Sequence, residues 1–204
     1  MTDPAPDPDD PAAEPTLDRS GQNSLGQNSS GARWTAVAFS GSLRAESANL
    51  GLVRLAAELA PAALAVEITD LPSELPWYNP DLEESLPDVA VRWREMIGAC
   101  DVIVIGLPEY NFGPSALAKN AIDWLTRPLG PHALQGKVVA LLTAGGKGGG
   151  AKAQESVGVV VTAFGNTLVT EPPVAVPLGS KLIGPTGTED EEIRALVAAR
   201  MANV

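Results

Sequence analysis

Residues 101–128 read DVIVIGLPEYNFGPSALAKNAIDWLTRP, and this stretch predicts how the whole chain folds. Its uninterrupted apolar run, 102–105, indicates a strand that is buried on both faces of a sheet. A polar and aromatic turn, 107–113, follows. Pro114 is expected in the first turn of a helix, where a missing N–H is tolerated, and Pro128 ends that helix. The turn should therefore lie at the carboxyl edge of a parallel sheet, where open α/β proteins bind ligands.

Strands and helices alternate on both sides of this stretch. Further strands are expected at residues 34–39, 64–69, 137–143 and 166–176, the last of them broken by Pro172-Pro173, and further helices at residues 50–60, 88–99, 151–164 and 189–200. A Thr-x-x-Glu capping box at 188–191 marks the start of the last helix. Such alternation implies a parallel sheet with helices on both faces.

Two doubly wound strand orders are common for such a sheet, 3-2-1-4-5-6 and 2-1-3-4-5. Unusual turns follow the first, third and fourth expected strands, and only the second order places these strands side by side. If the turns form one site, the second order is preferred. We therefore predict a flavodoxin-like α/β fold, a doubly wound five-stranded parallel sheet with order 2-1-3-4-5 and helices on both faces.

The first 33 residues differ in composition from the rest. They are rich in Pro, Asp, Ser, Gly, Asn and Gln, and the sequence GQNS occurs at 21–24 and again at 26–29. Six acidic residues and Arg19 precede Gly31, so residues 1–30 carry five of the eleven net negative charges. A segment of this kind cannot bury enough apolar surface to offset its ordering entropy. We expect a disordered tail at 1–33 and a single domain at 34–204.

Composition excludes several classes of function. The acidic chain repels nucleic-acid phosphates, and no basic stripe opposes this, so nucleic acid is not an expected partner. No stretch approaches the roughly 18 apolar residues of a membrane span, and the N-terminus lacks the features of a signal peptide. Cys100 is the only cysteine, which excludes an intramolecular disulfide. A cytoplasmic protein that does not bind membranes is expected.

The sequence contains few side chains that could act as catalysts. His132 is the only histidine. It lies in a Pro- and Gly-rich loop, where it is expected to be solvated. No spaced carboxylates suggest a metal site. We therefore expect no metal and no catalytic side chain, and if the protein is an enzyme, a cofactor carries the chemistry.

The first unusual turn, 40–49, combines hydroxyls and amides with a cation. Its hydrogen-bonding side chains are those of Ser40, Ser42, Ser47 and Asn49, and Arg44 adds a planar guanidinium. Together with the free N–H groups that open the following helix, they suit a terminal phosphate. The alternative is a Ser/Gly turn that only caps the helix.

The other two turns could meet a planar ligand. The second, Pro108 to Phe112, presents a Tyr-Asn pair, and the third, Thr143 to Gly150, is rich in glycine. Glycines let a backbone come close to a ring because no Cβ atom intervenes. The alternatives are ordinary surface for the second turn and a flexible loop for the third.

Several of these motifs also resemble a known family. Pro108-Glu109-Tyr110-Asn111 with the KNAIDW block of 119–124, and the Gly-Ser-Leu-Arg of 41–44 with Ser47 and Asn49, are similar to the NAD(P)H-dependent FMN reductases, which include flavodoxin-like quinone and chromate reductases. The resemblance covers most of 34–176. It implies FMN as the cofactor, bound by Ser40, Ser42, Arg44, Ser47, Asn49, Pro108, Glu109, Tyr110, Asn111, Phe112, Thr143, Gly145 and Gly146.

The resemblance also implies an activity. In that family a hydride passes from NADPH or NADH to flavin N5 and then, by a ping-pong route, to a flavin, quinone or similar small acceptor. Members are commonly homodimers or homotetramers, and Trp77, Tyr78 and the helix around Trp124 are candidate subunit contacts. Two alternatives share the fold: a flavodoxin-like electron carrier, which Arg44 and the PEYN turn argue against, and a non-catalytic flavin or small-molecule binding module.

Overall fold

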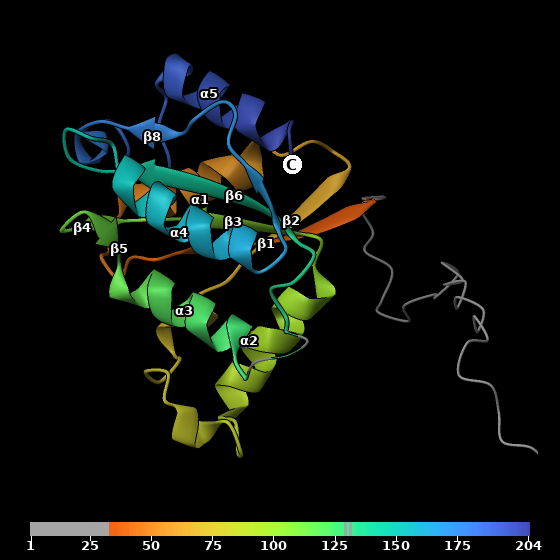
Figure 1. Cartoon of the computed structure of the whole chain (residues 1–204). Coiled ribbons are helices and arrows are strands. Elements are labelled where there is room, and N and C mark those ends of the chain that lie inside the picture. Colours follow the sequence, from red (N-terminus) through yellow and green to blue (C-terminus); the bar gives the residue numbers. More distant parts are fainter. Residues whose placement is uncertain (1–32, 129, 131) are drawn as a thin grey trace, which may run out of the picture.

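The chain folds around one parallel sheet. The computed structural model describes residues 33–128, 130 and 132–204, so the expected tail lies outside the described residues apart from Arg33. The strands are β1 Trp34–Ser40, β2 Leu64–Ile68, β3 Val102–Gly106, β6 Val138–Ala144, β7 Thr167–Val169 and β8 Ala175–Val176. Their order is β2-β1-β3-β6-β7, and β8 also pairs with β6 (Figure 1). In the numbering of the five strands expected from the sequence, β6 is the fourth strand and β7 is the fifth. The observed order is then 2-1-3-4-5, so the predicted order is confirmed.

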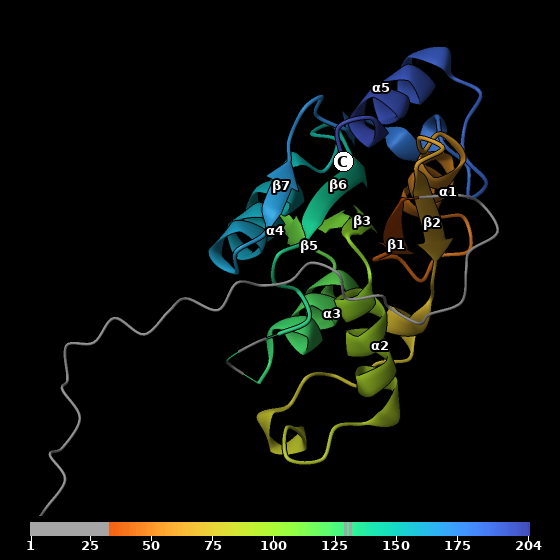
Figure 2. The same cartoon turned by 90° about the vertical axis from the view of Figure 1, so that its right-hand side faces the viewer.

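Helices cover both faces of the sheet. They are α1 Ala48–Glu58, α2 Asp88–Ala99, α3 Ala116–Thr126, α4 Ala151–Ala163 and α5 Glu191–Met201. Helices α2, α3 and α4 pack on one face, and α1 and α5 pack on the other (Figure 2). Within the described part of the chain, no helix is both long and apolar enough to cross a membrane.

The central strand β3 supplies side chains to both hydrophobic cores. Ile103 and Ile105 join the core under α2, α3 and α4, whereas Val102 and Val104 join the core under α1 and α5. This alternation follows from the pleat of a strand, in which successive side chains point to opposite faces. All four side chains are buried, so the prediction of a doubly buried strand is confirmed.

The segment after β3, for which a turn followed by a helix from Pro114 was expected, forms a hairpin. Strand β4, Glu109–Tyr110, pairs antiparallel with β5, Gly113–Pro114. The two loop residues, Asn111 and Phe112, have φ angles of 52° and 66°, as in a two-residue type I′ turn. Helix α3 begins only at Ala116, capped by the Ser115 side chain. The prediction that Pro114 lies in the first turn of a helix was therefore wrong. Pro114 lies in an edge strand, which tolerates a missing N–H just as a helix start does.

The last expected strand, 166–176, is split in two. β7 pairs with the first half of β6, and β8 pairs with Thr143 and Ala144 at its end. Between them lie Pro172 and Pro173, which have no N–H to donate to a ladder. The chain leaves the sheet there and returns to it, which carries the residues after β8 to the carboxyl edge.

The start of the last helix also differs from the prediction. Helix α5 begins at Glu191, and the Asp190 carboxylate caps it by accepting from the N–H groups of Glu192 and Ile193. The Thr188 hydroxyl instead donates to the Leu182 carbonyl at 2.7 Å. The expected capping box was wrong because two neighbouring residues can each act as the cap, and Asp is at least as good a cap as Thr.

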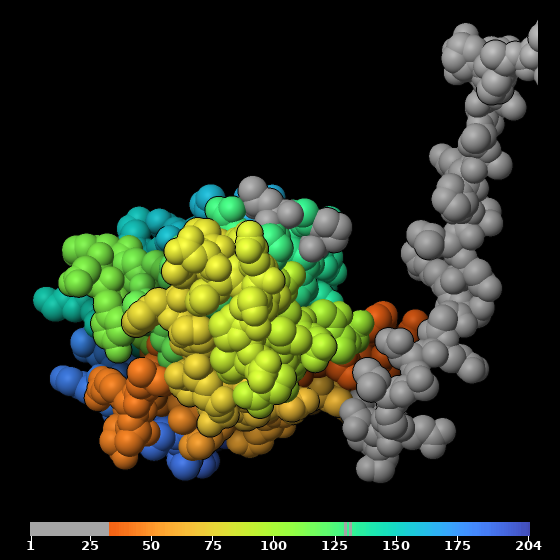
Figure 3. Space-filling view, turned by 90° about the horizontal axis from the view of Figure 1, so that it is seen from below, coloured from red at the N-terminus to blue at the C-terminus, as the bar shows by residue number. Residues whose placement is uncertain are grey.

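The long segment between β2 and α2 lies on the outer surface beside α2, where Figure 3 shows it in yellow. It contains two short 3-10 helices, Leu71–Ser73 and Pro80–Leu82. Tyr78 packs edge-on against Trp124, whose indole N–H donates to the Pro76 carbonyl at 2.8 Å. The Trp124 side chain is fully buried within its own chain, so a subunit contact through its helix would have to use other residues of that helix.

Candidate functional site

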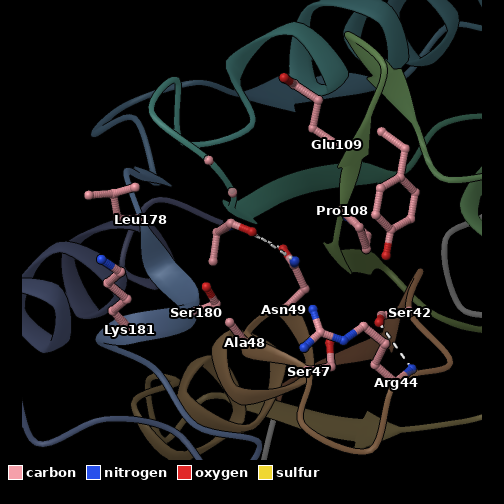
Figure 4. Close-up of a pocket in the computed structure, with 14 residues that line it drawn as sticks. Ser42, Arg44, Ser47, Ala48, Asn49, Pro108, Glu109, Leu178, Ser180 and Lys181 are labelled. Atoms are coloured by element: carbon pink, nitrogen blue, oxygen red, sulfur yellow. Dashed lines mark hydrogen bonds between the residues drawn. The ribbon is translucent and has the colours of Figure 1, made fainter.

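The three unusual turns meet at the carboxyl edge of the sheet. They follow β1, β3 and β6, which are neighbours, and they enclose a cavity of about 230 Å³ (Figure 4). Most of the residues predicted from the sequence line it: Ser42, Arg44, Ser47, Asn49, Pro108, Glu109, Tyr110, Gly145 and Gly146. The expectation that these turns converge is confirmed, and the cavity is the candidate site.

The first turn is ordered by its own hydroxyls. The Ser40 Oγ accepts from the Ser42 N–H, and the Ser42 Oγ accepts from the Arg44 N–H, both at 3.3 Å. Ser47 caps α1 by accepting from the Leu50 N–H at 3.2 Å. The Arg44 side chain is left exposed at the cavity wall. The sequence left two alternatives for this turn, a helix cap and a ligand-binding loop. The structure combines them, because the serines cap the helix and shape the turn that leaves Arg44 at the cavity wall.

Asn49 ties the first turn to the third. Its side-chain amide donates to the Ala144 carbonyl and accepts from the Ala144 N–H, both at 3.0 Å. The side chain is buried, with 6% of its surface exposed. The sequence predicted a phosphate ligand here, whereas in the structure both ends of this amide fix the position of the glycine-rich turn.

Glu109 ties the second turn to the third. Its carboxylate accepts from the backbone N–H groups of Lys152 and Ala153, at 2.8 and 3.2 Å, in the first turn of α4. The residue at the N-cap position of α4 is Gly150, with φ 95° and no side chain to offer. Glu109 therefore caps, from a distant hairpin, a helix that lacks its own cap, and its charge suits the positive end of the helix dipole.

Ser115 completes this set by tying the second turn to the first. Its hydroxyl donates to the Gly41 carbonyl at 2.7 Å. A Cβ atom on Gly41 would lie 2.7 Å from that same hydroxyl oxygen, so the contact requires glycine. Each pair of turns is thus joined by one polar side chain, which fixes the shape of the cavity without a ligand.

Four of the predicted residues do not line the cavity: Ser40, Asn111, Phe112 and Thr143. Thr143 is buried beneath the third turn, where its hydroxyl accepts from the Gln154 amide at 2.9 Å. Asn111 and Phe112 form the tip of the hairpin, and Phe112 is 81% exposed. The sequence identified the right turns, but it could not say which side chains in them point inward.

One wall of the cavity was missed by the sequence reasoning. It comes from the segment after β8 and consists of Leu178, Ser180 and Lys181, while Ala48 and Ala144 add small side chains beside the predicted residues. A Cβ atom on Gly179 would lie 2.5 Å from the Ala144 Cβ, so this segment packs closely on the third turn. The Gly-Ser-Lys sequence of 179–181 is separated from β8 by Pro177 and Leu178, and none of the turns singled out in the sequence follows the last strand, so this wall was not predicted.

Two cations face the cavity. The ion pairs recorded within the described residues are Arg92–Glu74, Lys119–Asp123, Lys152–Glu155 and Arg194–Glu58, and they include neither Arg44 nor Lys181. The net charge of the chain is −11, so two positive side chains around one cavity favour an anionic ligand. The described residues contain no cluster of His, Cys, Asp or Glu that could hold a metal ion.

His132 lies far from this cavity. Its ring packs edge-on against Phe164, at the opposite end of α4 from the glycine-rich turn. It is half-buried rather than solvated as the sequence suggested, and burial, with a smaller effect of Arg94, lowers the pKa of its imidazole. No histidine therefore serves the site.

Comparison with known proteins gives a consistent result. The chain matches the family described as NADPH-dependent FMN reductase over residues 35–181. It is 41% identical over 123 residues to an NADPH:quinone oxidoreductase of Arabidopsis thaliana (58% of this chain, 61% of that one). It is 38% identical over 120 residues to an NAD(P)H-dependent FMN reductase of Pseudomonas aeruginosa (58% and 64%). The alignments thus span about three-fifths of the length of these curated relatives.

A solved structure extends the likeness to nearly the whole fold. FerB, a flavoenzyme NAD(P)H:(acceptor) oxidoreductase from Paracoccus denitrificans, superposes with a TM-score of 0.72 at 28% identity, covering 83% of this chain and 96% of that one. The family match runs from β1 through β8 and includes all three turns of the site and Lys181. The chain therefore belongs to the NADPH-dependent FMN reductase family.

Proposed function

We propose that this chain is an NAD(P)H-dependent oxidoreductase that binds FMN in the three-turn cavity and reduces a small acceptor such as a quinone or a flavin. The observation that carries the proposal is the cavity itself, which is cationic and hydroxyl-rich at the first turn and glycine-lined at the third. Membership of the family supports it, as do the names of the relatives, which are quinone and FMN reductases.

The first turn fits the phosphate of FMN. Arg44 offers a planar, permanently charged donor, and Ser42 offers a hydroxyl beside it. The start of α1 lies at the same wall, since Ala48 and Asn49 line it, and a helix N-terminus favours an anion. Among the predicted phosphate ligands, we assign contact to Ser42 and Arg44 and a positioning role to Ser47 and Asn49.

The other two turns fit the flavin ring. Pro108, Glu109 and Tyr110 line the cavity on the side of the hairpin, and Gly145 and Gly146 line it on the side of the third turn. A Cβ atom on Gly146 would meet nothing within 4 Å, so this position leaves open space for a planar group. The backbone there can approach the ring closely.

When bound, FMN supplies hydride transfer through its N5 atom, from either nicotinamide cofactor and toward the acceptor. The residues of this chain bind the phosphate, hold the ring between two turns and keep the turns in register through Asn49, Glu109 and Ser115. No histidine faces the cavity, so protons for the acceptor come from solvent.

We propose further that residues 34–204 form one folding unit, that 1–33 lie outside it, and that the protein works in the cytoplasm. The continuous sheet and the two cores that it separates support the single unit. Limited proteolysis tests the boundary: cleavage confined to the first 33 residues is expected, and early cleavage within 34–204 would contradict it.

We also propose a homodimer or homotetramer. Among the contacts suggested by the sequence, Trp77 is 70% exposed on the segment beside α2, whereas the Trp124 side chain is buried. Light scattering on Trp77→Ser and on the wild type is expected to show a smaller assembly for the variant. A monomeric wild type would contradict the proposal.

The visible spectrum of the purified protein, before and after anaerobic NADPH or NADH, tests the main proposal. Bands near about 370 and 450 nm that bleach on addition are expected for a reductase with bound FMN. Bands that persist with both nucleotides would favour an electron carrier instead. A protein that shows no bands after FMN is supplied would contradict the assignment of the cavity.

The variant Arg44→Gln links the spectrum to the site. We expect it to lower FMN affinity about tenfold or more, because a charge-assisted contact to the phosphate is lost. Arg92 lies on α2 and forms an exposed ion pair with Glu74. Arg92→Gln removes an equal charge from this pair, so it serves as the matched control. Equal effects of the two variants would remove Arg44 from the site.

A further inference from the structure

Lys181 lines the cavity from a segment that no motif identified. It ends the short 3-10 helix Gly179–Lys181, which follows β8. Its side chain is exposed, and within the described residues it takes part in no recorded ion pair. Its ammonium group is therefore available to a ligand of the cavity.

The segment that carries Lys181 is held firmly against the start of α1. A Cβ atom on Gly51 would lie 2.0 Å from the Gly184 carbonyl oxygen, and one on Gly179 would lie 2.5 Å from the Ala144 Cβ. These two close approaches fix the segment between α1 on one side and the third turn on the other. The Cα position of Lys181 is therefore determined by the fold, while its long side chain can turn toward an anion.

Lys181 and Arg44 lie on opposite sides of the N-terminus of α1. In Figure 4, Ser180, Ala48 and Ser47 lie between the two cations, at the level where the helix begins. The flavin ring, by contrast, is assigned to the part of the cavity between the hairpin and the third turn. An anion at the start of α1 would thus have a positive side chain on each side.

We propose that Lys181 is the second cationic ligand of the FMN phosphate, opposite Arg44. The inference rests on the proposed function, because it takes FMN as the ligand of the cavity. A phosphate monoester carries about −1.5 to −2 charges at pH 7, so one arginine alone leaves it incompletely neutralised. A second donor on the far side matches both the charge and the several acceptor oxygens of the phosphate.

The test compares FMN with riboflavin, which has the same ring and lacks the phosphate. Both are titrated into the flavin-free protein and followed by flavin fluorescence, for the wild type, Lys181→Gln and Lys147→Gln. Lys147 is the matched control because it is an exposed lysine of the neighbouring glycine-rich turn and does not line the cavity. Riboflavin affinity also reports whether Lys181→Gln leaves the ring site folded.

We expect Lys181→Gln to weaken FMN binding about tenfold or more and to change riboflavin affinity by less than about twofold. Lys147→Gln should leave both affinities within about twofold of the wild type. Raising the salt concentration should weaken FMN binding more steeply in the wild type than in Lys181→Gln. The variant lacks the charged contact that salt would screen.

Three results would overturn the inference. Equal weakening of FMN and riboflavin would assign Lys181 to the ring. Unchanged FMN affinity with a raised KM for NADPH, and not for NADH, would assign it to the phosphate of the co-substrate. Unchanged values throughout would leave it without a role in the site. If the wild type binds no FMN, the proposed function itself fails. If the wild type binds FMN more tightly than riboflavin and Lys181→Gln keeps that preference, only the Lys181 inference fails.

Discussion

Residues in the site motifs divide between those that face the cavity and those that hold its frame. Arg44 and Ser42 offer groups to a ligand, whereas Asn49, Glu109 and Ser115 bond the backbone of another turn. Asn49 and Glu109 do both, since they line the cavity while Asn49 bonds Ala144 and Glu109 caps α4. Substitution of a frame residue should therefore reduce stability as well as ligand binding.

Glu109→Ala tests this at a single position. The change leaves the N–H groups of Lys152 and Ala153 without their acceptor and removes a negative charge from the start of α4. We expect the free energy of unfolding to fall by about 1–2 kcal/mol in urea titrations. Glu155→Ala is the control, because it removes only an exposed ion pair with Lys152 and should cost less than about 0.5 kcal/mol. Similar losses for the two variants would show that Glu109 is not a cap.

His132 makes a second prediction at the residue scale. Burial lowers the pKa of its imidazole from the ordinary 6.5, so the folded chain holds the proton less tightly than the unfolded chain does. The stability that depends on the neutral ring is therefore complete above about pH 6.5 and declines as the pH falls through this value toward the folded pKa.

The measurement is direct because the chain has one histidine. Proton NMR should show a single imidazole titrating below pH 6.5 in the folded protein. His132→Leu should remove part of the loss of stability between pH 7 and pH 5. A titration at or above 6.5 would mean that the ring is not desolvated as the contact with Phe164 indicates.

At the scale of elements, the cavity depends on how closely α1 approaches the segment after β8. Gly51→Ala places a methyl group 2.0 Å from the Gly184 carbonyl oxygen, so the segment must move away. We expect a loss of about 1–3 kcal/mol in the free energy of unfolding, typical of overpacking. Because Lys181 lies on the displaced segment, FMN affinity should fall in the same variant.

Gly98→Ala is the matched control for this prediction. Gly98 lies within α2, and a Cβ atom there would meet nothing within 4 Å. Alanine should therefore stabilise the protein by about 0.5–1 kcal/mol, as expected for an exposed helical position. Equal effects of the two substitutions would show that the contact between α1 and Gly184 is not tight.

The sequence allowed most elements to be predicted, for local reasons. The apolar run of β3 and the alternation of strands and helices determine the sheet order, and the turns after β1, β3 and β6 then have to meet. Pro114 and Thr188 were misplaced because each has two acceptable local environments, and tertiary contacts decide between them. Lys181 was missed because its place in the site depends on where the chain re-enters the sheet after Pro172 and Pro173, which no local pattern encodes.

At the scale of the whole molecule, one buried side chain links the last helix to the edge of the sheet. Arg200 of α5 is 1% exposed and donates to the carbonyls of Leu141, Val169, Thr170 and Pro172, with N–O distances of 3.2 Å to Leu141, 2.7 Å to Val169 and 2.8 Å to the other two. Burial lowers the pKa of its guanidinium. Two of these carbonyls, those of Thr170 and Pro172, belong to the excursion between β7 and β8, and the other two belong to β6 and β7, so Arg200 ties the excursion to the sheet and positions the chain that leads to the cavity wall.

Arg200→Met should be severely destabilising. It fills the space but leaves the four carbonyls without their donor, and we expect a loss of about 3 kcal/mol or more in urea-induced unfolding. Arg194→Gln on the same helix is the control, since its ion pair with Glu58 is solvent-accessible and should contribute less than about 1 kcal/mol. A loss below 1 kcal/mol for Arg200→Met would mean that water replaces the guanidinium.

The wall formed by Ser180 and Lys181 has a consequence for the order of events during synthesis. The first turn leaves the ribosome long before this wall does, because the two are separated by most of the chain. A nascent chain that ends before the wall has the serines and Arg44 but no closed cavity. Under the proposed assignment of this cavity to FMN, flavin capture is therefore expected to follow translation of the C-terminal elements.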